Sequence, residues 1–247
     1  LIYGGKVFDV KGSLEERVGL FLKLAERKGW YVVNYDHIGN PYALEGYKTI
    51  GYEISEQLGW QAPDHVIVPT GSGEGISGVY KGFKELYELG WIQTMPRIHA
   101  AQVEGNDPLV RAVNAKLDNV VPLSVMEPTV VGGINTDITG YTALEAVIAT
   151  GGTGVTVSEK EALEGEKLMA TREAVYTEPA SGVVFYGIRK LKEQGVISPD
   201  ASVVCVATSH GLKDLRATKA IVREPFEIPA DIKAFDNKLK EWNEQLI

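Results

Sequence analysis

The apolar residues of the chain alternate between a helical period and short continuous runs. Over residues 14–25 and 75–89 they recur every three to four positions, which predicts helices with one buried face. Residues 65–68 and 203–207 are short apolar runs, which is typical of buried strands. Apolar strands that alternate with helices indicate parallel β–α units. The sequence therefore predicts an α/β fold with helices on both faces of a parallel sheet.

Further elements continue this alternation to the end of the chain. Two capping boxes, Ser13 with Glu16 and Ser158 with Glu161, mark the beginnings of helices. Further strands are predicted at 31–33, 97–103 and 154–157, and further helices at 47–59, 142–149, 181–193 and from residue 231.

Composition narrows the function classes. The chain has 247 residues, is 44% hydrophobic and carries a net charge of -8, which indicates a globular protein and argues against a nucleic-acid partner. Apolar runs fall short of the roughly 20 residues that cross a bilayer, so no membrane association is expected. The single cysteine, Cys205, excludes an intrachain disulfide and a cysteine-based metal site, and none of the four histidines has ligand spacing to another. A reducing cytoplasm is the expected location.

A glycine-rich loop lies between the apolar run at 65–68 and the following helix. It reads Thr-Gly-Ser-Gly-Glu-Gly over residues 70–75. Glycine backbone and a helix N-terminus together favour an anion, and phosphate above all. Lysine is absent where a P-loop requires it, and no acidic residue ends a second strand as in a dinucleotide fold. A tight turn with glycine for packing is the alternative interpretation.

A second polar segment follows the apolar run at 203–207. Thr208 and Ser209 are expected at the same edge of the sheet as the glycine loop, because ligands bind beyond the carboxyl ends of parallel strands. Thr208 could instead cap the next turn. His210 is expected to be a turn residue, and Cys205 a core residue rather than a nucleophile.

Three segments, in the same order, resemble threonine synthases. Residues 40–50 (Asn-Pro-Tyr-Ala-Leu-Glu-Gly-Tyr-Lys-Thr-Ile) are similar to the Asn-Pro-x-Arg-x-Glu-Gly-x-Lys-Thr segment of that family. Residues 70–75 resemble its phosphate loop, and residues 208–214 resemble its Thr-Gly-x-Gly-Leu-Lys-Asp segment. Residues 102–105 and 178–181 also look like family segments.

The resemblance implies a tryptophan synthase β-like fold, fold type II of the enzymes that use pyridoxal 5'-phosphate (PLP). It implies that the cofactor phosphate is held by the backbone N–H groups of Gly71, Ser72, Gly73, Glu74 and Gly75. It further implies that Thr208 meets the pyridine nitrogen and that Asn40 and Lys48 order the loop near the substrate.

The chain lacks the family's Schiff-base lysine segment, so no catalytic residue is assigned. It is expected to be the C-terminal two-thirds of such an enzyme, inactive alone, with 1–34 as a remnant of the small domain and 35–247 as the large PLP-binding domain. Ala43 replaces the family arginine that helps bind the substrate phosphate. Glu74, unusual beside a phosphate, is expected to be exposed in the first helical turn.

The resemblance implies the function of a threonine-synthase-like lyase, which catalyses γ-elimination and β-replacement on an amino acid. In the family, this reaction converts O-phosphohomoserine to threonine. The chain is expected to be a fragment or subunit of such an enzyme. Three alternatives stay open. The first is a fold-type-II enzyme for another amino acid, similar to cysteate synthase, an amino-acid thiolase or an ammonia-lyase. The second is a non-catalytic relative that binds PLP or phosphate, and the third is a nucleotide- or sugar-phosphate-binding α/β protein. A homodimer, or pairing with a missing N-terminal part, is expected.

Overall fold

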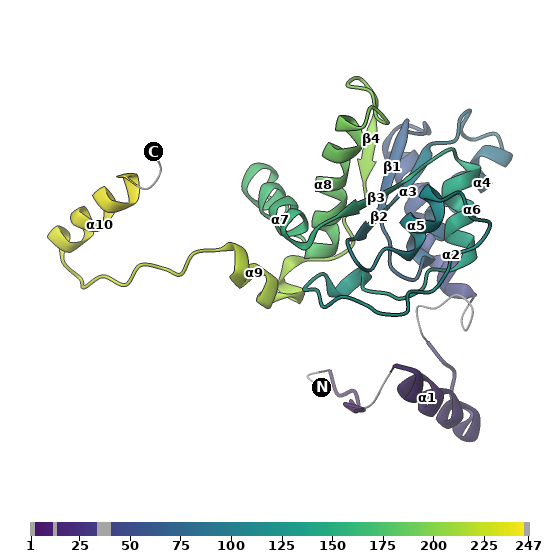
Figure 1. The fold of residues 1–247 in the computed structure, drawn as a ribbon, viewed down its shortest axis with the longest axis horizontal. Coiled ribbons are helices and arrows are strands. Elements are labelled where there is room, and N and C mark those ends of the chain that lie inside the picture. Colours follow the sequence, from purple (N-terminus) through teal and green to yellow (C-terminus); the bar gives the residue numbers. More distant parts are fainter. Residues whose placement is uncertain (1–2, 12–13, 34–40, 245–247) are drawn as a thin grey trace.

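A parallel sheet forms the centre of the protein. The computed structural model describes residues 3–11, 14–33 and 41–244, and within them a four-stranded sheet has the order β3-β2-β1-β4. The strands are β1 (His65–Pro69), β2 (Arg97–Val103), β3 (Gly154–Val157) and β4 (Val203–Cys205). Every adjacent pair is parallel, so the chain returns over the faces of the sheet between strands (Figure 1).

Helices cover both faces of this sheet. On one face pack α4 (Glu74–Glu88), α5 (Pro108–Asn114) and α6 (Tyr141–Ala149). On the other face packs α8 (Pro179–Glu193), which in turn is covered by α7 (Glu159–Glu173). This confirms the predicted α/β architecture.

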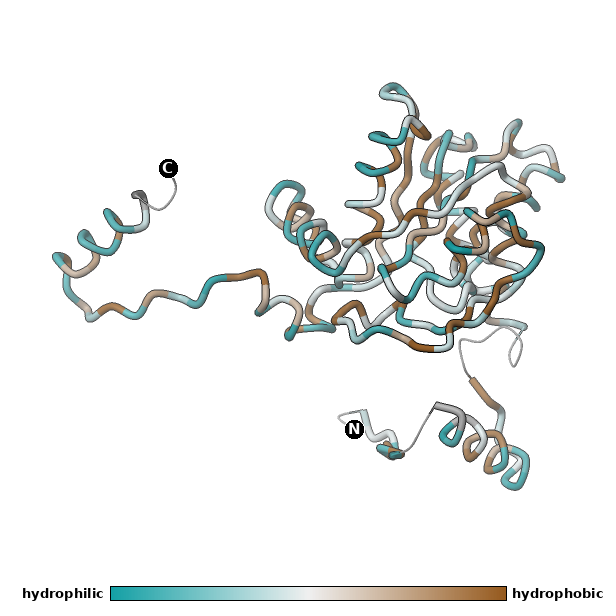
Figure 2. Tube along the Cα trace, in the orientation of Figure 1, coloured by the Kyte–Doolittle hydropathy of each residue, from teal (hydrophilic) through white to brown (hydrophobic). Residues whose placement is uncertain are grey.

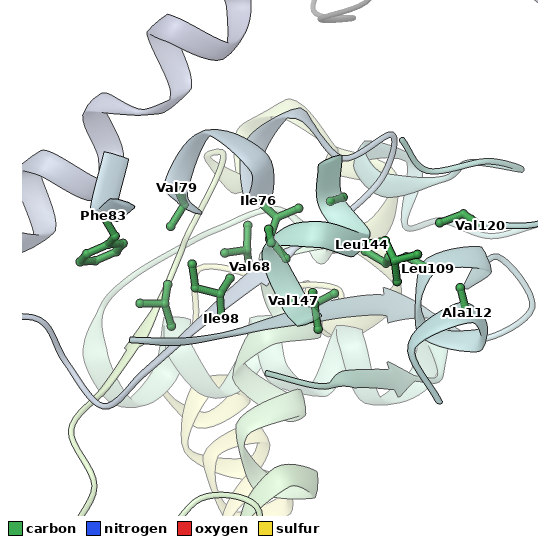
Figure 3. Packing of buried hydrophobic residues seen from close by; sticks show 14 of the residues in the cluster. Val68, Ile76, Val79, Phe83, Ile98, Leu109, Ala112, Val120, Leu144 and Val147 are labelled. Atoms are coloured by element: carbon green, nitrogen blue, oxygen red, sulfur yellow. The ribbon is translucent and has the colours of Figure 1, made fainter. Parts of the chain in front are cut away.

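Two apolar cores lie on the two sides of the sheet. Successive strand residues point to opposite faces, so Val66 and Val68 enter one core and Ile67 enters the other. Figure 3 shows the first core, in which Val68 and Ile98 of the sheet lie close to Val79 and Phe83 of α4. Together the two cores hold the strands rigidly, which fixes the position of the loops that leave their carboxyl ends.

The remaining helices and turns complete the described structure. They are α1 (Leu14–Lys28), α2 (Tyr42–Tyr47), α3 (Thr49–Gln57), α9 (Leu215–Ile221), α10 (Ile232–Glu244) and the 3-10 turns η1 (Gly132–Ile134) and η2 (Gly211–Lys213). Helices α1 and α10 lie apart from the sheet (Figure 1), and in both of them hydrophobic and hydrophilic positions alternate (Figure 2). Among the described helices, none combines the length and apolarity that crossing a membrane requires.

Most predicted strands are confirmed, and two predictions need correction. The strands at 65–68, 97–103 and 154–157 appear as β1, β2 and β3. The predicted strand at 31–33 is wrong, because in the described part of the chain these residues pair with no strand. Strand β4 ends at Cys205, two residues earlier than predicted, and is only partly buried because it lies at the sheet edge.

The helix predictions are also largely confirmed. The capping box of Ser158 and Glu161 is present, whereas Ser13 lies outside the described residues. The predicted helix at 47–59 is observed as α3, which begins at Thr49 and ends at Gln57. The preceding helix α2 meets it at Lys48, whose backbone packs against Gly82 of α4. The sequence does not predict helices α2, α5 and α9, because six or seven residues are too few to display a helical period.

Candidate functional site

The two predicted polar segments emerge at the same edge of the sheet. Strands β1 and β4 are neighbours and parallel, with Ile67 opposite Cys205. The glycine loop that follows β1 and Thr208, which follows β4, therefore both leave the carboxyl edge. This is the edge at which open parallel sheets bind ligands.

Glycine is required at the turn into α4. Gly73 caps the helix with φ of 112°, a backbone conformation that L side chains rarely adopt. A Cβ on Gly73 would also lie 2.8 Å from the Cβ of Ala143 and 3.0 Å from the Cγ2 of Thr139. The loop can thus take this path only because position 73 has no side chain.

The backbone of the loop presents donors rather than acceptors. Within the described residues, the N–H groups of Gly71, Ser72 and Gly73 donate to no protein acceptor, whereas the Gly71 and Ser72 carbonyls accept from Thr139 Oγ1 and Gly140 N, each at 2.8 Å. Available N–H groups at the N-terminus of a 15-residue helix suit a phosphate in charge and in hydrogen bonding. The loop therefore fits the phosphate of PLP.

Glu74 departs from its expected environment. It does lie in the first turn of α4, but only 6% of its surface is exposed, so the expectation of an exposed carboxylate is wrong. Its Oε2 accepts a hydrogen bond from Ser72 Oγ at 2.5 Å. This donor and the positive end of the helix dipole offset part of the cost of burying the carboxylate.

Thr208 belongs to a cluster of polar side chains at the end of β4. Its N–H donates to Ser181 Oγ at 3.0 Å, and its Oγ1 lies 3.3 Å from Glu178 Oε1. Glu178 is buried at the N-terminus of α8, and its other carboxylate oxygen pairs with Lys213 Nζ at 3.0 Å. The backbone of Thr208 is thereby fixed, while its side chain remains exposed.

A 3-10 turn, η1, connects the loop to this cluster. A Cβ on Gly71 would lie 3.2 Å from the Cα of Ile134, and a Cβ on Gly133 would lie 3.2 Å from both carboxylate oxygens of Glu178. The glycine loop, η1 and the Thr208 cluster are therefore in close succession along one edge. The structure brings together the two polar segments that the sequence singled out.

Lys48 is held in an ion-pair network, and Asn40 lies outside the described residues. The Lys48 ammonium is 2.6 Å from Glu45 Oε2 and 3.0 Å from Glu85 Oε2, and Tyr52 donates to Glu85 as well. The carboxylates of Glu45 and then Glu85 raise the pKa of Lys48. Lys48 thus links α2 and α3 to α4, the helix that begins at the glycine loop.

His210 is a turn residue as expected, whereas Cys205 is only partly buried against the second core. His210 Nδ1 accepts from the N–H of Leu212 at 3.1 Å and so caps η2, which is a turn role. Burial raises the pKa of the Cys205 thiol to about 12, so the thiolate needed of a nucleophile is disfavoured.

Sequence reasoning assigned no role to four residues that support this edge, although three of them lie in the family-like segments 102–105 and 178–181: Gln102, Thr139, Glu178 and Ser181. All four are at most 5% exposed. Two signals could have found Gln102 and Glu178. One is a lone polar residue inside an apolar strand, and the other is a Glu-Pro pair at the start of a helix. Thr139 lies in an irregular segment, and Ser181 in the first turn of a helix, where serine is common.

Comparison with known sequences identifies the family to which the chain belongs. Residues 1–209 match the family of pyridoxal-phosphate dependent enzymes, and the chain belongs to that family. Its cofactor class, PLP, is the one that the sequence predicted.

Threonine synthases are close relatives by sequence. The enzyme of Methanocaldococcus jannaschii is 37% identical over 98% of this chain and 59% of its own length. That of Methanosarcina acetivorans is 35% identical over 95% of this chain and 57% of its own length. The chain therefore spans less than two thirds of these relatives.

Solved structures confirm the predicted fold. Maize serine racemase superimposes with a TM-score of 0.69 at 22% identity, over 89% of this chain and 63% of that one. The threonine deaminase of T.th. superimposes with a TM-score of 0.68 at 23% identity, over 86% of this chain and 65% of that one. The architecture is the tryptophan synthase β-like fold of PLP enzymes.

Proposed function

We propose that this chain provides the phosphate-binding part of the active site of a threonine-synthase-like, PLP-dependent lyase. The observation that carries the proposal is the set of available N–H groups at residues 71–73, at the N-terminus of α4 and beside Thr208. The sequence similarity to threonine synthases supports the reaction class. Bound PLP supplies an electron sink for a carbanion at the α-carbon of an amino acid.

Different residues of the chain hold different parts of the cofactor. The N–H groups of residues 71–73, with those of Glu74 and Gly75 in the first helical turn, hold the phosphate. The Thr208 hydroxyl holds the ring nitrogen without placing a charge beside it. Ser181 Oγ accepts from the Thr208 N–H and so fixes the backbone of Thr208, which leaves its hydroxyl free to turn from Glu178 to the ring nitrogen.

Binding of inorganic phosphate, PLP and pyridoxal to the full chain tests this proposal directly. Pyridoxal lacks the phosphate and is therefore the matched control ligand. PLP is expected to bind at least 100-fold more tightly than pyridoxal, because several charge-assisted hydrogen bonds each contribute about 1.5–3 kcal/mol. Equal affinities for PLP and pyridoxal in calorimetric titrations would exclude the glycine loop as the site that binds the cofactor phosphate.

Replacing Thr208 with valine tests the ring contact. Loss of one neutral hydrogen bond of about 1 kcal/mol is expected to weaken PLP about fivefold and to shift its absorption spectrum. Inorganic phosphate is expected to bind as before. Thr171→Val, which removes an exposed hydroxyl bonded to the Lys167 carbonyl in α7, is the control. An unchanged PLP affinity and spectrum in Thr208→Val would remove Thr208 from the site.

Ala43 favours a second candidate, a related enzyme for another amino acid. Ala43 lies in α2, half-buried, where threonine synthases resemble this chain but carry arginine. A methyl group offers no bidentate donor to a substrate phosphate. Release of phosphate from O-phosphohomoserine, compared with release of ammonia from threonine and serine by the full-length enzyme, distinguishes the two candidates.

The proposal also covers the domain division, the substrate class, the location and the assembly of the protein. Residues 1–34 are assigned to a small domain and 35–247 to the large PLP-binding domain, which the separation of α1 from the sheet supports (Figure 1). The substrate is a small amino acid, and the location is cytoplasmic. The assembly is a homodimer, or a pairing of this chain with a further N-terminal part. Exposed Phe21 and Leu22 of α1 support such association, and sedimentation of the full chain tests it.

A further inference from the structure

Three successive carbonyl groups of the glycine loop each accept a hydrogen bond from a different donor. The Thr70 carbonyl accepts from Gln102 Nε2 at 3.1 Å. The Gly71 carbonyl accepts from Thr139 Oγ1 at 2.8 Å, and the Ser72 carbonyl accepts from the N–H of Gly140 at 2.8 Å. Three consecutive peptide groups are thus oriented by donors that come from outside the loop.

The orientation of these carbonyls determines that of the neighbouring N–H groups. Peptide bonds in the described residues are all trans, and in a trans peptide the C=O of one residue and the N–H of the next point in opposite directions. With the carbonyls of residues 70–72 directed at Gln102, Thr139 and Gly140, the N–H groups of residues 71–73 must point away from those donors. These are the N–H groups that have no protein acceptor within the described residues.

The donors are themselves fixed in one orientation. Gln102 is fully buried, and its Oε1 accepts from the N–H of Val110 at 3.0 Å. If the side-chain amide were flipped, Nε2 would face the Val110 N–H and Oε1 would face the Thr70 carbonyl, so neither hydrogen bond could form. Gln102 Nε2 also lies 3.4 Å from Thr139 Oγ1. The Thr139 hydroxyl therefore accepts from Gln102 and donates to the Gly71 carbonyl, and each bond in such a chain strengthens the next.

We propose that Gln102 and Thr139 are positioning residues that set the affinity of the loop for a phosphate group. A rotated peptide group would turn a carbonyl oxygen toward the anion in place of an N–H, and would replace attraction by repulsion. The two side chains hold the peptide groups in the binding orientation before the ligand arrives, so no reorganisation is needed on binding. This inference rests on the proposed function of the loop.

Variants of Thr139 in the full-length protein test the inference. Thr139→Val keeps the shape and removes the hydroxyl, and is expected to lower the affinity for inorganic phosphate and for PLP about tenfold while leaving pyridoxal unchanged. Thr139→Ser restores the hydroxyl and is expected to bind phosphate within about twofold of the wild type. Gln102→Met, tested in the same way, is expected to show the same selective loss.

Thr150→Val is the matched control. Thr150 Oγ1 also bonds to backbone, accepting from the N–H of Ile98 and donating to the Ala146 carbonyl, but it does so at the amino end of β2. This variant is expected to lower the unfolding temperature without changing the ratio of PLP to pyridoxal affinity.

Three outcomes would overturn the inference, and each would do so for a different reason. Wild-type phosphate affinity in Thr139→Val would show that the hydroxyl does not position the loop. Equal losses for PLP and pyridoxal would show a general structural defect. A wild-type protein that does not distinguish PLP from pyridoxal would remove the proposed function, and this inference with it.

Discussion

Replacing Gly73 with alanine is expected to lower the free energy of unfolding by roughly 2–5 kcal/mol. The backbone conformation alone costs an L residue about 1–3 kcal/mol, and overpacking against Ala143 and Thr139 adds a similar amount. Relief of the contact requires the loop to move away from Thr139 and Gly140. Two carbonyl hydrogen bonds would then be lost, and phosphate affinity is expected to fall roughly 30-fold to 100-fold.

Gly75→Ala is the stability control for this prediction. A Cβ on Gly75 would meet only Val68 Cγ1, at 4.0 Å, and the residue lies in the first turn of α4 with no positive φ. Alanine is favoured over glycine in helices by about 0.5–1 kcal/mol, so this variant is expected to be as stable as the wild type or slightly more stable. Urea unfolding compares the two. Similar stabilities for Gly73→Ala and Gly75→Ala would contradict the account of the turn.

The loop could be predicted from sequence because its chemistry is local. A glycine-rich segment between an apolar strand and an amphipathic helix fixes a backbone turn and a helix N-terminus, whatever surrounds them. The need for glycine at position 73 was not predictable in the same way. Its close contacts come from Thr139 and Ala143, more than sixty residues further along the chain.

Long-range polar contacts account for most of what the sequence did not predict. Glu74 was expected at the surface because its helix position favours a carboxylate there, and nothing local shows that the fold covers it. Gln102 and Glu178 stand out only as parts of family segments, because the Thr70 carbonyl that Gln102 binds and the Thr208 hydroxyl that Glu178 binds lie 32 and 30 residues away. Burial depends on which elements pack together, and the local pattern does not determine that packing.

Glu166 of α7 is the clearest case of such a buried polar group. Its side chain is fully buried, and neither carboxylate oxygen has a hydrogen-bond partner within the described part of the chain. The close approach of α8 causes the burial: a Cβ on Gly182 would lie 2.0 Å from the Ala162 carbonyl oxygen and 2.9 Å from the Glu166 nitrogen. Burial first, and then the negative charges of Asp214 and Glu178, raise the pKa of Glu166 from 4.5 to about 7.

The raised pKa links folding stability to pH in a defined direction. Between pH 4.5 and about 7 the folded protein retains the Glu166 proton, whereas the unfolded chain has released it. The folded state therefore binds more protons, and stability falls as pH rises through this window. Above about pH 7 both states are ionised and the loss is complete. A shift of this size corresponds to about 3 kcal/mol, at about 1.4 kcal/mol for each pKa unit.

Replacing Glu166 with glutamine is expected to remove this pH dependence. The variant is expected to be about 3 kcal/mol more stable than the wild type at pH 8.5 and within about 0.5 kcal/mol of it at pH 4, because glutamine resembles the protonated acid in shape and carries no charge. Urea unfolding of the full chain at the two pH values gives both numbers. Glu164→Gln removes an exposed carboxylate from the same helix and is expected to change stability by less than about 0.5 kcal/mol at either pH. Parallel pH profiles for the wild type and Glu166→Gln would show that Glu166 is ionised, and therefore paired or solvated, in the folded protein.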